Sequence, residues 1–193
     1  MQIEKTPLPG VLVLVPKRIG DARGFFSESW NRRTLQAAGL ELPEFVQDNH
    51  SMSAVAGTLR GLHFQSPPHA QGKLVRCGRG RLFDVAVDIR KGSPTYGQWF
   101  GAELSFENAR QLWIPAGFLH GFMTREPDTE IVYKCTDHYA PECDGGVAWD
   151  SVGIDWGGQG QPVLSAKDAA APALADFDSP FTYAGPFEYE ARS

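Results

Sequence analysis

The stretch Leu82-Phe-Asp-Val-Ala-Val-Asp-Ile89 decides the fold class of this 193-residue chain. Within it, every second residue from Phe83 to Ile89 is apolar, whereas Asp84 and Asp88 fall on the opposite face. This period of two is the pattern of a β-strand, because successive side chains of a strand point to opposite faces. A helix would repeat its apolar positions every three or four residues instead. The stretch therefore predicts a strand.

Short apolar or alternating segments of the same kind recur along most of the chain. The further expected strands are residues 11–15, 45–49, 73–77, 98–104, 111–114 and 130–136. Turns that contain glycine or proline separate these segments, for example at Gly78-Arg-Gly80. Many short strands at hairpin spacing predict an antiparallel sandwich or barrel.

Helical signals are confined to two short segments. Residues 32–38 are followed by a glycine that suits a helix C-terminus. Ser165 is placed to cap a second short helix, with Asp168 at its third position. The tail after Pro172 is expected to pack over the sheet as irregular chain. Because the sequence contains no internal repeat or linker, we expect residues 1–193 to form a single domain.

The composition argues against several classes of partner. The formal net charge of -5 does not provide the broad basic surface that nucleic-acid binding needs. The longest apolar run near the N-terminus, residues 11–15, is far shorter than the ~20 residues of a membrane span. Three cysteines without a CxxC pair, and no signal segment, indicate a reduced compartment. We therefore expect a cytoplasmic protein that binds neither nucleic acid nor membrane.

The motifs of the commonest cofactor and nucleophile sites are also absent from the sequence. It contains no Walker loop, no GxGxxG, no GxSxG and no HExxH. Hydride, phosphoryl and acyl transfer therefore lose most of their support.

Polar groups inside apolar segments point to a different chemistry. Pro115-x-Gly117-x-x-His120 has the form of the second cupin motif, in which a turn delivers a histidine onto the next strand of a small barrel. The first cupin motif would supply His-x-His, but here His63 is followed at plus two by Gln65. This spacing does not assemble a metal-ligand set, so no metal is expected.

A site without a metal can still remove a proton that lies next to a ketone. His63, as a neutral imidazole, can accept the carbon-bound proton and leave an enolate. Lys73 and His120 are suited to stabilise the enolate oxygen. Tyr133, which is neutral at pH 7, can return a proton on the opposite face. Alone, however, His63 and Tyr133 would more often be satisfied core residues.

The sequence resembles the dTDP-4-dehydrorhamnose 3,5-epimerase family over most of its length, from Phe25 to about Pro172. The resemblance is carried by residues 47–51, 60–65, 71–76, 84–90, 93–95, 111–122, 133–134, 139–141 and 164–168. It implies a mainly β protein with a cupin-like double-stranded β-helix (jelly roll) and a few short helices. It also implies epimerisation of dTDP-4-keto-6-deoxy-D-glucose at carbons 3 and 5 through enolates, giving dTDP-4-keto-L-rhamnose without a cofactor.

The resemblance assigns roles to matching positions. His63 matches the general base, paired with the carboxylate of Asp168, and Tyr133 matches the acid on the other face of the sugar. Lys73 and His120 match residues near the ketone. The other matched positions contact the substrate: Arg60 at the diphosphate and sugar, Tyr139 stacked on thymine, Lys167 as a polar contact, and Gln47, Asp48, Asn49, Arg23, Phe26 and Glu28 at the nucleotide. The family forms homodimers, and residues 23–28 can come from the neighbouring subunit.

One position departs from the family pattern. Asp144 stands where many members have Glu, and we expect the shorter side chain to reach its partner through a water. A second interpretation also exists for Asp168, since a carboxylate in the first turn of a helix favours the helix dipole whatever else it does.

Other functions fit parts of the same sequence. A mono-epimerase acting at carbon 3 or carbon 5 would share the base and differ in how the sugar is held. A non-catalytic sugar-binding cupin would need the cavity but not the pair of His63 and Asp168. A metal-dependent cupin oxygenase would contain stoichiometric metal after purification.

Overall fold

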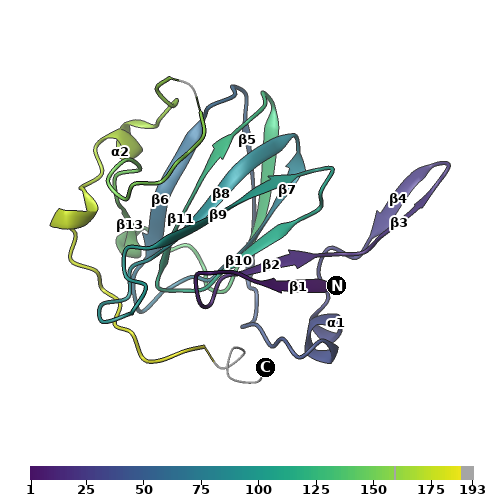
Figure 1. Ribbon diagram of the computed structural model, residues 1–193, viewed down its shortest axis with the longest axis horizontal. Helices are drawn as coiled ribbons and strands as arrows, with labels where there is room; N and C mark the ends of the chain where they lie inside the picture. Colours follow the sequence, from purple (N-terminus) through teal and green to yellow (C-terminus); the bar gives the residue numbers. More distant parts are fainter. Residues whose placement is uncertain (159, 188–193) are drawn as a thin grey trace.

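The computed structural model describes residues 1–158 and 160–187, and two antiparallel sheets make up its body (Figure 1). The first sheet contains, in spatial order, β1 (Gln2–Lys5), β2 (Leu12–Val15), β10 (Gln111–Ile114), β7 (Lys73–Arg79), β12 (Thr129–Cys135) and β5 (Gln47–Ser53). The second sheet contains β13 (Asp144–Gly146), β6 (Leu59–Gln65), β11 (Phe118–Thr124), β8 (Arg81–Asp88) and β9 (Trp99–Ser105). This arrangement confirms the mainly β jelly roll expected from the sequence.

Every strand expected from the alternation pattern is present, with ends shifted by a few residues at most. Two longer strands, β6 and β11, were not among those expected, although most of their residues are buried. The structure also adds short strands that the pattern did not predict, namely β1, β13 and a hairpin of β3 (Arg18–Asp21) and β4 (Gly24–Ser27). These strands are largely polar or exposed, so their sequences carry little apolar alternation.

The space between the two sheets is filled by apolar side chains from both of them. Val75 and Leu112 of the first sheet pack with Leu82, Ala86 and Leu104 of the second in one buried cluster. A core that joins both sheets is what the expected single domain requires.

Each sheet is covered on its outer face as well. Trp113 and Leu74 of the first sheet pack against Leu35 of α1 (Arg32–Ala37). The outer face of the second sheet is covered by the chain after β13, where Trp156 and Phe181 join its cluster. The polar and the apolar face of β8 are therefore both buried, and its apolar face lies against the C-terminal chain rather than in the space between the sheets.

The two predicted helices form where expected. Asn31 caps α1 by accepting hydrogen bonds from the amides of Arg33 and Thr34. Ser165 caps the four-residue helix α2 (Ala166–Ala169) by accepting from the amide of Asp168 at 3.1 Å. Two short 3-10 segments complete the helical content of the described residues, η1 (Pro141–Cys143) and η2 (Leu174–Asp176).

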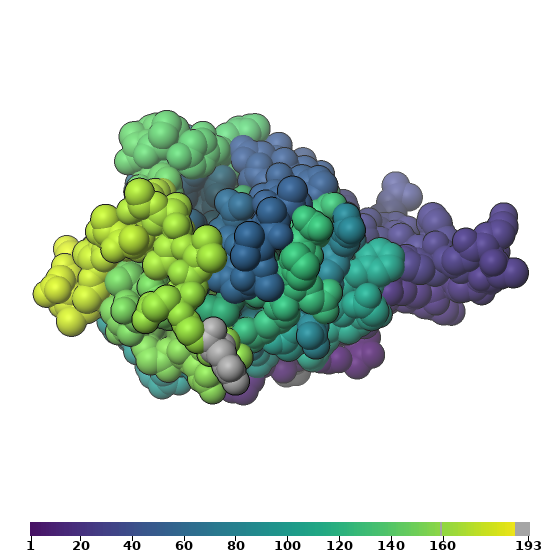
Figure 2. Space-filling model, turned by 90° about the horizontal axis from the view of Figure 1, so that it is seen from above, coloured from purple at the N-terminus to yellow at the C-terminus, as the bar shows by residue number. Residues whose placement is uncertain are grey.

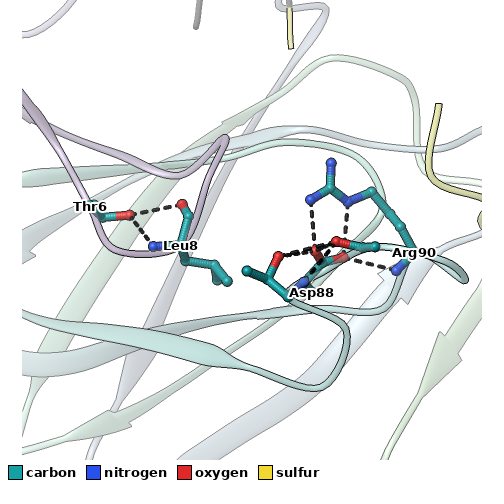
Figure 3. A network of polar contacts seen from close by, with 6 residues as sticks. Thr6, Leu8, Asp88 and Arg90 are labelled. Atoms are coloured by element: carbon teal, nitrogen blue, oxygen red, sulfur yellow. Dashed lines mark hydrogen bonds and ion pairs between the residues drawn. The ribbon is translucent and has the colours of Figure 1, made fainter. Parts of the chain in front are cut away.

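The C-terminal chain is attached to the end of β8 by a buried polar network. Asp88 accepts hydrogen bonds from the Arg90 side chain at 2.9 and 2.7 Å, as Figure 3 shows. The Arg90 guanidinium lies over the ring of Tyr183 at 5.1 Å. The tail after Pro172 therefore packs over the sheet as predicted for its described part, whereas residues 188–193 lie outside the described residues.

The hairpin of β3 and β4 stands apart from the body. It extends to one end of the molecule in both views, opposite the end where α2 and the C-terminal chain lie (Figures 1 and 2). Within the described chain, no helix combines the length and the apolar character needed to cross a membrane.

Candidate active site

A cavity of about 460 Å³ opens between the two sheets. Strands β5, β6, β7, β11 and β12, helix α2 and the residues just before β6 and α2 supply its lining. The lining residues are Ser51, Thr58, Leu59, Arg60, His63, Lys73, His120, Phe122, Tyr133, Val163, Leu164, Ser165, Lys167 and Asp168. A hollow of about 220 Å³ shares His63, Lys73, Tyr133 and Lys167 with it and adds Gln47, Asn49, Tyr139 and Asp144 to the lining. Because they share these lining residues, we describe the two volumes as one site.

Strand register sets the positions of the two histidines. His63 lies directly opposite His120 in the antiparallel pair of β6 and β11. These strands approach closely at two facing glycines, since a Cβ built at Gly61 would lie 2.5 Å from the Cα of Gly121. Glycine at both positions therefore allows the contact that brings the histidines to the same wall of the cavity.

His63 is paired with Asp168, as the resemblance implied. The Nε2 atom of His63 lies 2.6 Å from Oδ1 of Asp168, and Asp168 is almost fully buried. Burial lowers the pKa of His63 below its ordinary value, although the hydrogen bond to Asp168 and the charge of its carboxylate act in the opposite direction. The imidazole is therefore neutral at pH 7, with Nε2 engaged and Nδ1 available as a base.

His120 forms a second pair of the same kind with Asp84 of β8. The Nε2 atom of His120 lies 2.7 Å from Oδ1 of Asp84, and both residues are buried. Burial raises the pKa of the Asp84 carboxyl group, while the charge of His120 acts against this rise.

Lys73 and Tyr133 reach the cavity from the first sheet. Burial lowers the pKa of Lys73, and no carboxylate of the described residues forms an ion pair with its ammonium group. Burial raises the pKa of Tyr133, which keeps the phenol protonated over a wide pH range. The Tyr133 ring lies 6.4 Å from that of His120. His63 and Tyr133 thus enter the cavity from opposite sheets.

The end of the site that is lined by Gln47, Asn49 and Tyr139 contains polar groups that hydrogen-bond to one another. Gln47 and Asn49 lie on the same face of β5, and the Gln47 amide donates to Oδ1 of Asn49 at 3.0 Å. Gln47 also accepts from the backbone amide of Tyr139 at 2.9 Å, which fixes the chain that carries this exposed ring. At the other end, the Arg60 guanidinium donates to the carbonyl of Met52 at 3.1 Å.

Asp144 contacts its partners directly, so the expectation of a bridging water is wrong for this structure. Its carboxylate pairs with the ammonium group of Lys167 and accepts from the hydroxyl of Tyr139 at 3.3 Å. The shorter side chain is therefore long enough to join α2 to the Tyr139 loop.

Four residues assigned by the resemblance do not reach the cavity within this chain. Asp48 points to the opposite face of β5, where its carboxylate pairs with Lys134 at 2.8 Å. Arg23 pairs with Asp21 on the projecting hairpin, and Phe26 is 71% exposed there. Glu28 accepts hydrogen bonds from Asn31 and Thr34 at the start of α1.

Gln65, which stands where the first cupin motif has a metal-ligating histidine, forms hydrogen bonds to the backbone instead. Its amide donates to the carbonyl of His138 at 3.0 Å and accepts from the amide of Ala140 at 3.0 Å. In residues 1–158 and 160–187, no three His, Cys, Asp or Glu side chains are grouped so that they could hold a metal ion.

Sequence reasoning missed some residues of the site. Ser51, Thr58 and Phe122 line the cavity without having been assigned to it. Asp84 was also missed, although a carboxylate in the middle of an otherwise apolar strand is a usable signal.

A jelly roll that carries a carboxylate-paired histidine, a lysine and a tyrosine around one cavity defines a cupin-type enzyme of acid-base chemistry. The sequence profile of the dTDP-4-dehydrorhamnose 3,5-epimerase family matches residues 5–176. The chain therefore belongs to this family of isomerases.

Individual relatives agree with this assignment. A protein of Salmonella typhimurium named dTDP-4-dehydrorhamnose 3,5-epimerase is 55% identical over 176 residues, which cover 90% of this chain and 96% of that protein. The structure of dTDP-6-deoxy-D-glucose-3,5-epimerase from Legionella pneumophila in complex with dTDP-4-keto-L-rhamnose has a TM-score of 0.89 at 46% identity, covering 95% of this chain and 99% of that one. A 3'-monoepimerase from Streptomyces bikiniensis, solved with dTDP-quinovose, has a TM-score of 0.82 at 33% identity, covering 89% of this chain and 87% of that one.

Proposed function

We propose that this protein converts dTDP-4-keto-6-deoxy-D-glucose to dTDP-4-keto-L-rhamnose by inverting carbons 3 and 5. The observation that carries the proposal is the hydrogen-bonded pair of His63 and Asp168 on one wall of a cavity that has Tyr133 on the other. The Salmonella and Legionella relatives support this choice, because both are named as 3,5-epimerases of dTDP-linked deoxysugars and the ligand of the latter is dTDP-4-keto-L-rhamnose, the product proposed here.

In the proposed reaction, Nδ1 of His63 takes the proton from the carbon next to the ketone. Asp168 holds the ring through Nε2, so that the imidazolium that forms is stabilised by a carboxylate at 2.6 Å. The electron pair of the broken C–H bond moves to the ketone oxygen and forms an enolate. Lys73, whose ammonium group has no carboxylate partner in the described chain, stabilises this oxygen together with His120.

Tyr133 then returns a proton on the opposite face of the sugar. It suits this role because it enters from the sheet opposite His63 and because its raised pKa keeps the phenol protonated. Once His63 has released its proton to solvent and Tyr133 has regained one, the same steps at the second carbon complete the conversion. Neither proton transfer changes the oxidation state, so the residues named here account for the reaction without a redox cofactor.

The long site can hold the rest of the sugar nucleotide. Arg60 lies at one side of His63 and provides a cation for the diphosphate. Tyr139 and the pair of Gln47 and Asn49 provide a stacking ring and hydrogen-bonding groups for the base.

We further propose a homodimer in which the hairpin of one subunit reaches the nucleotide site of the other. This hairpin extends away from the body of its own chain (Figure 2). It carries the exposed apolar side chains Ile19, Phe25 and Phe26, of which Phe25 also contacts the ring of Phe106. Such a group of exposed apolar residues is typical of an interface. Light scattering of the purified protein tests the proposal, since a monomer at micromolar concentration would contradict it.

The protein is proposed to work in the cytoplasm. Cys77, Cys135 and Cys143 are all buried free thiols, which is compatible with a reducing compartment. Fractionation of cells that produce the protein would locate it.

The test of the function is incubation of the purified protein with dTDP-4-keto-6-deoxy-D-glucose in deuterated water, followed by NMR. We expect deuterium at carbons 3 and 5 and a product with the configuration of dTDP-4-keto-L-rhamnose. Deuterium at one carbon only would favour a mono-epimerase, the activity named for the similar structure from Streptomyces bikiniensis. No deuterium at either carbon would contradict the enzymatic function.

A further inference from the structure

The pair of His120 and Asp84 lies in the interior of the jelly roll, behind the cavity wall. His120 lines the cavity, whereas Asp84 does not. We infer that Asp84 is a positioning residue that holds His120 through Nε2 and thereby keeps Nδ1 of His120 protonated, as a hydrogen-bond donor toward the ketone oxygen. This inference rests on the proposed function for the identity of that oxygen.

Of the two ring nitrogens of His120, one contacts Asp84 and the other does not. Asp84 and His120 are diagonal neighbours on adjacent strands, because His120 is opposite Ala86 and Phe122 is opposite Asp84. The carboxylate contacts Nε2 at 2.7 Å, and Nδ1 has no hydrogen-bond partner among the described residues. Since the ring is in the cavity wall, Nδ1 is the nitrogen available to a ligand.

The number of protons in the pair decides what Nδ1 can do. If the pair holds one proton more than a carboxylate and a neutral imidazole, there are two arrangements. Either an Asp84 carboxylate faces an imidazolium, or a protonated Asp84 donates to Nε2 of a neutral ring. Nδ1 carries a hydrogen in both arrangements, so it donates wherever the shared proton lies.

The surroundings favour this extra proton. Asp84 is fully buried, and its Oδ2 atom has no hydrogen-bond partner. An unprotonated pair would therefore place a negative charge in the protein interior, which is costly. The charge of nearby Lys73 lowers the pKa of Asp84 and offsets part of this cost, but no ion pair joins the two groups.

The first measurement is a long-range 1H–15N NMR spectrum of the whole protein labelled with 15N-histidine. The chain has only 5 histidines, so a His120→Asn variant identifies the resonances of His120. We expect Nδ1 of His120 to have the chemical shift of a protonated nitrogen at pH 7 to 8. A shift typical of an unprotonated Nδ1 in the folded wild-type protein would overturn the inference, whatever the enzyme turns over.

The second measurement compares Asp84→Asn with Asp88→Asn. Both carboxylates are fully buried in β8 on the same face of the strand, but Asp88 bonds with Arg90, Ser93 and Thr95 instead of His120 (Figure 3). In Asp84→Asn we expect the shared proton on Nε2 to lose its downfield shift and kcat to fall by on the order of 10² to 10³, the usual effect of removing one oxyanion donor, with little change in KM.

The Asp88→Asn variant controls for the loss of a buried carboxylate as such. It is expected to lower thermal stability while the His120 resonances stay at their wild-type positions. An Asp84→Asn protein with wild-type kcat and an unprotonated Nδ1 of His120 would overturn the inference; the Nδ1 shift must be read as well, because an Asn amide that donates to Nε2 would itself keep Nδ1 protonated. If Asp84→Asn does not fold, the wild-type Nδ1 shift alone decides. Failure of the proposed function is recognised separately, because the wild-type enzyme would then leave the ketosugar unexchanged while its His120 spectrum could still be read.

Discussion

The two histidine-carboxylate pairs of this molecule have almost the same contact and different surroundings. Nε2 to Oδ1 is 2.6 Å in the pair of His63 and Asp168 and 2.7 Å in the pair of His120 and Asp84. The His63 side chain is 32% exposed and its partner comes from the short helix α2. The His120 side chain is 9% exposed and its partner is a strand residue without any exposure.

The difference shows how one arrangement can serve two purposes. A base needs a nitrogen that is unprotonated at working pH and within reach of the substrate, and His63 fulfils this because burial lowers its pKa. A donor needs a proton that stays in place, and the deeper pair suits this because burial raises the pKa of Asp84. Location in the fold, and not the type of residue pair, thus separates the two proposed roles.

The largest expected effect is the loss of the base. His63→Asn should reduce turnover of the ketosugar by up to ~10⁴, the upper range of what a general base contributes. Initial rates followed by NMR measure this loss. Equal thermal stability of the variant and the wild type is the necessary control, and a residual rate within tenfold of wild type would contradict the assignment.

The next effect concerns the enolate oxygen. Lys73→Met keeps an unbranched side chain that is one heavy atom shorter and removes the charge, so it should reduce kcat by ~10² to 10³. KM should change less, since the charge on the oxygen develops after binding. Steady-state kinetics separate the two constants, and a change confined to KM would show that Lys73 only binds the substrate.

A smaller and more specific effect is expected on the pH profile. Because the pKa of His63 lies below the ordinary value of about 6.5, kcat/KM should remain constant down through neutral pH and fall only as the pH drops through that lowered pKa. Asp168→Asn removes the group that raises the pKa of His63, so it should move this acid limb to still lower pH. A limb centred above 6.5, or moved upward in the variant, would contradict His63 as the group that must be neutral.

The smallest effect is expected at the rim of the site. Asp144→Glu restores the side chain that is common in the family and should preserve the ion pair with Lys167, which is partly exposed. Since exposed pairs contribute ~0 to 1 kcal/mol, KM should change by less than about fivefold. Isothermal titration with dTDP would check the same point, and a loss of binding beyond tenfold would mean that the shorter Asp144 is required.

Local patterns in the sequence predicted most of the core strands and both helices, because each depends on residues near one another in the chain. They did not predict which face of β8 lies inside. That depends on the C-terminal chain, whose Trp156 and Phe181 cover the apolar face from far along the sequence. For this reason Asp84 was not recognised as a partner of His120. The position of the hairpin that carries Arg23 and Phe26 depends in turn on a second subunit in the proposed dimer.

The most direct test of the division between base and acid is deuterium exchange measured separately in His63→Asn and Tyr133→Phe. Both proteins would be incubated with dTDP-4-keto-6-deoxy-D-glucose in deuterated water. His63→Asn should leave carbons 3 and 5 without deuterium, because no proton is removed. Tyr133→Phe should still introduce deuterium, with the original configuration retained, since His63 can return what it removes. Exchange at the wild-type rate in His63→Asn would contradict the central claim that His63, held by Asp168, removes the carbon-bound proton.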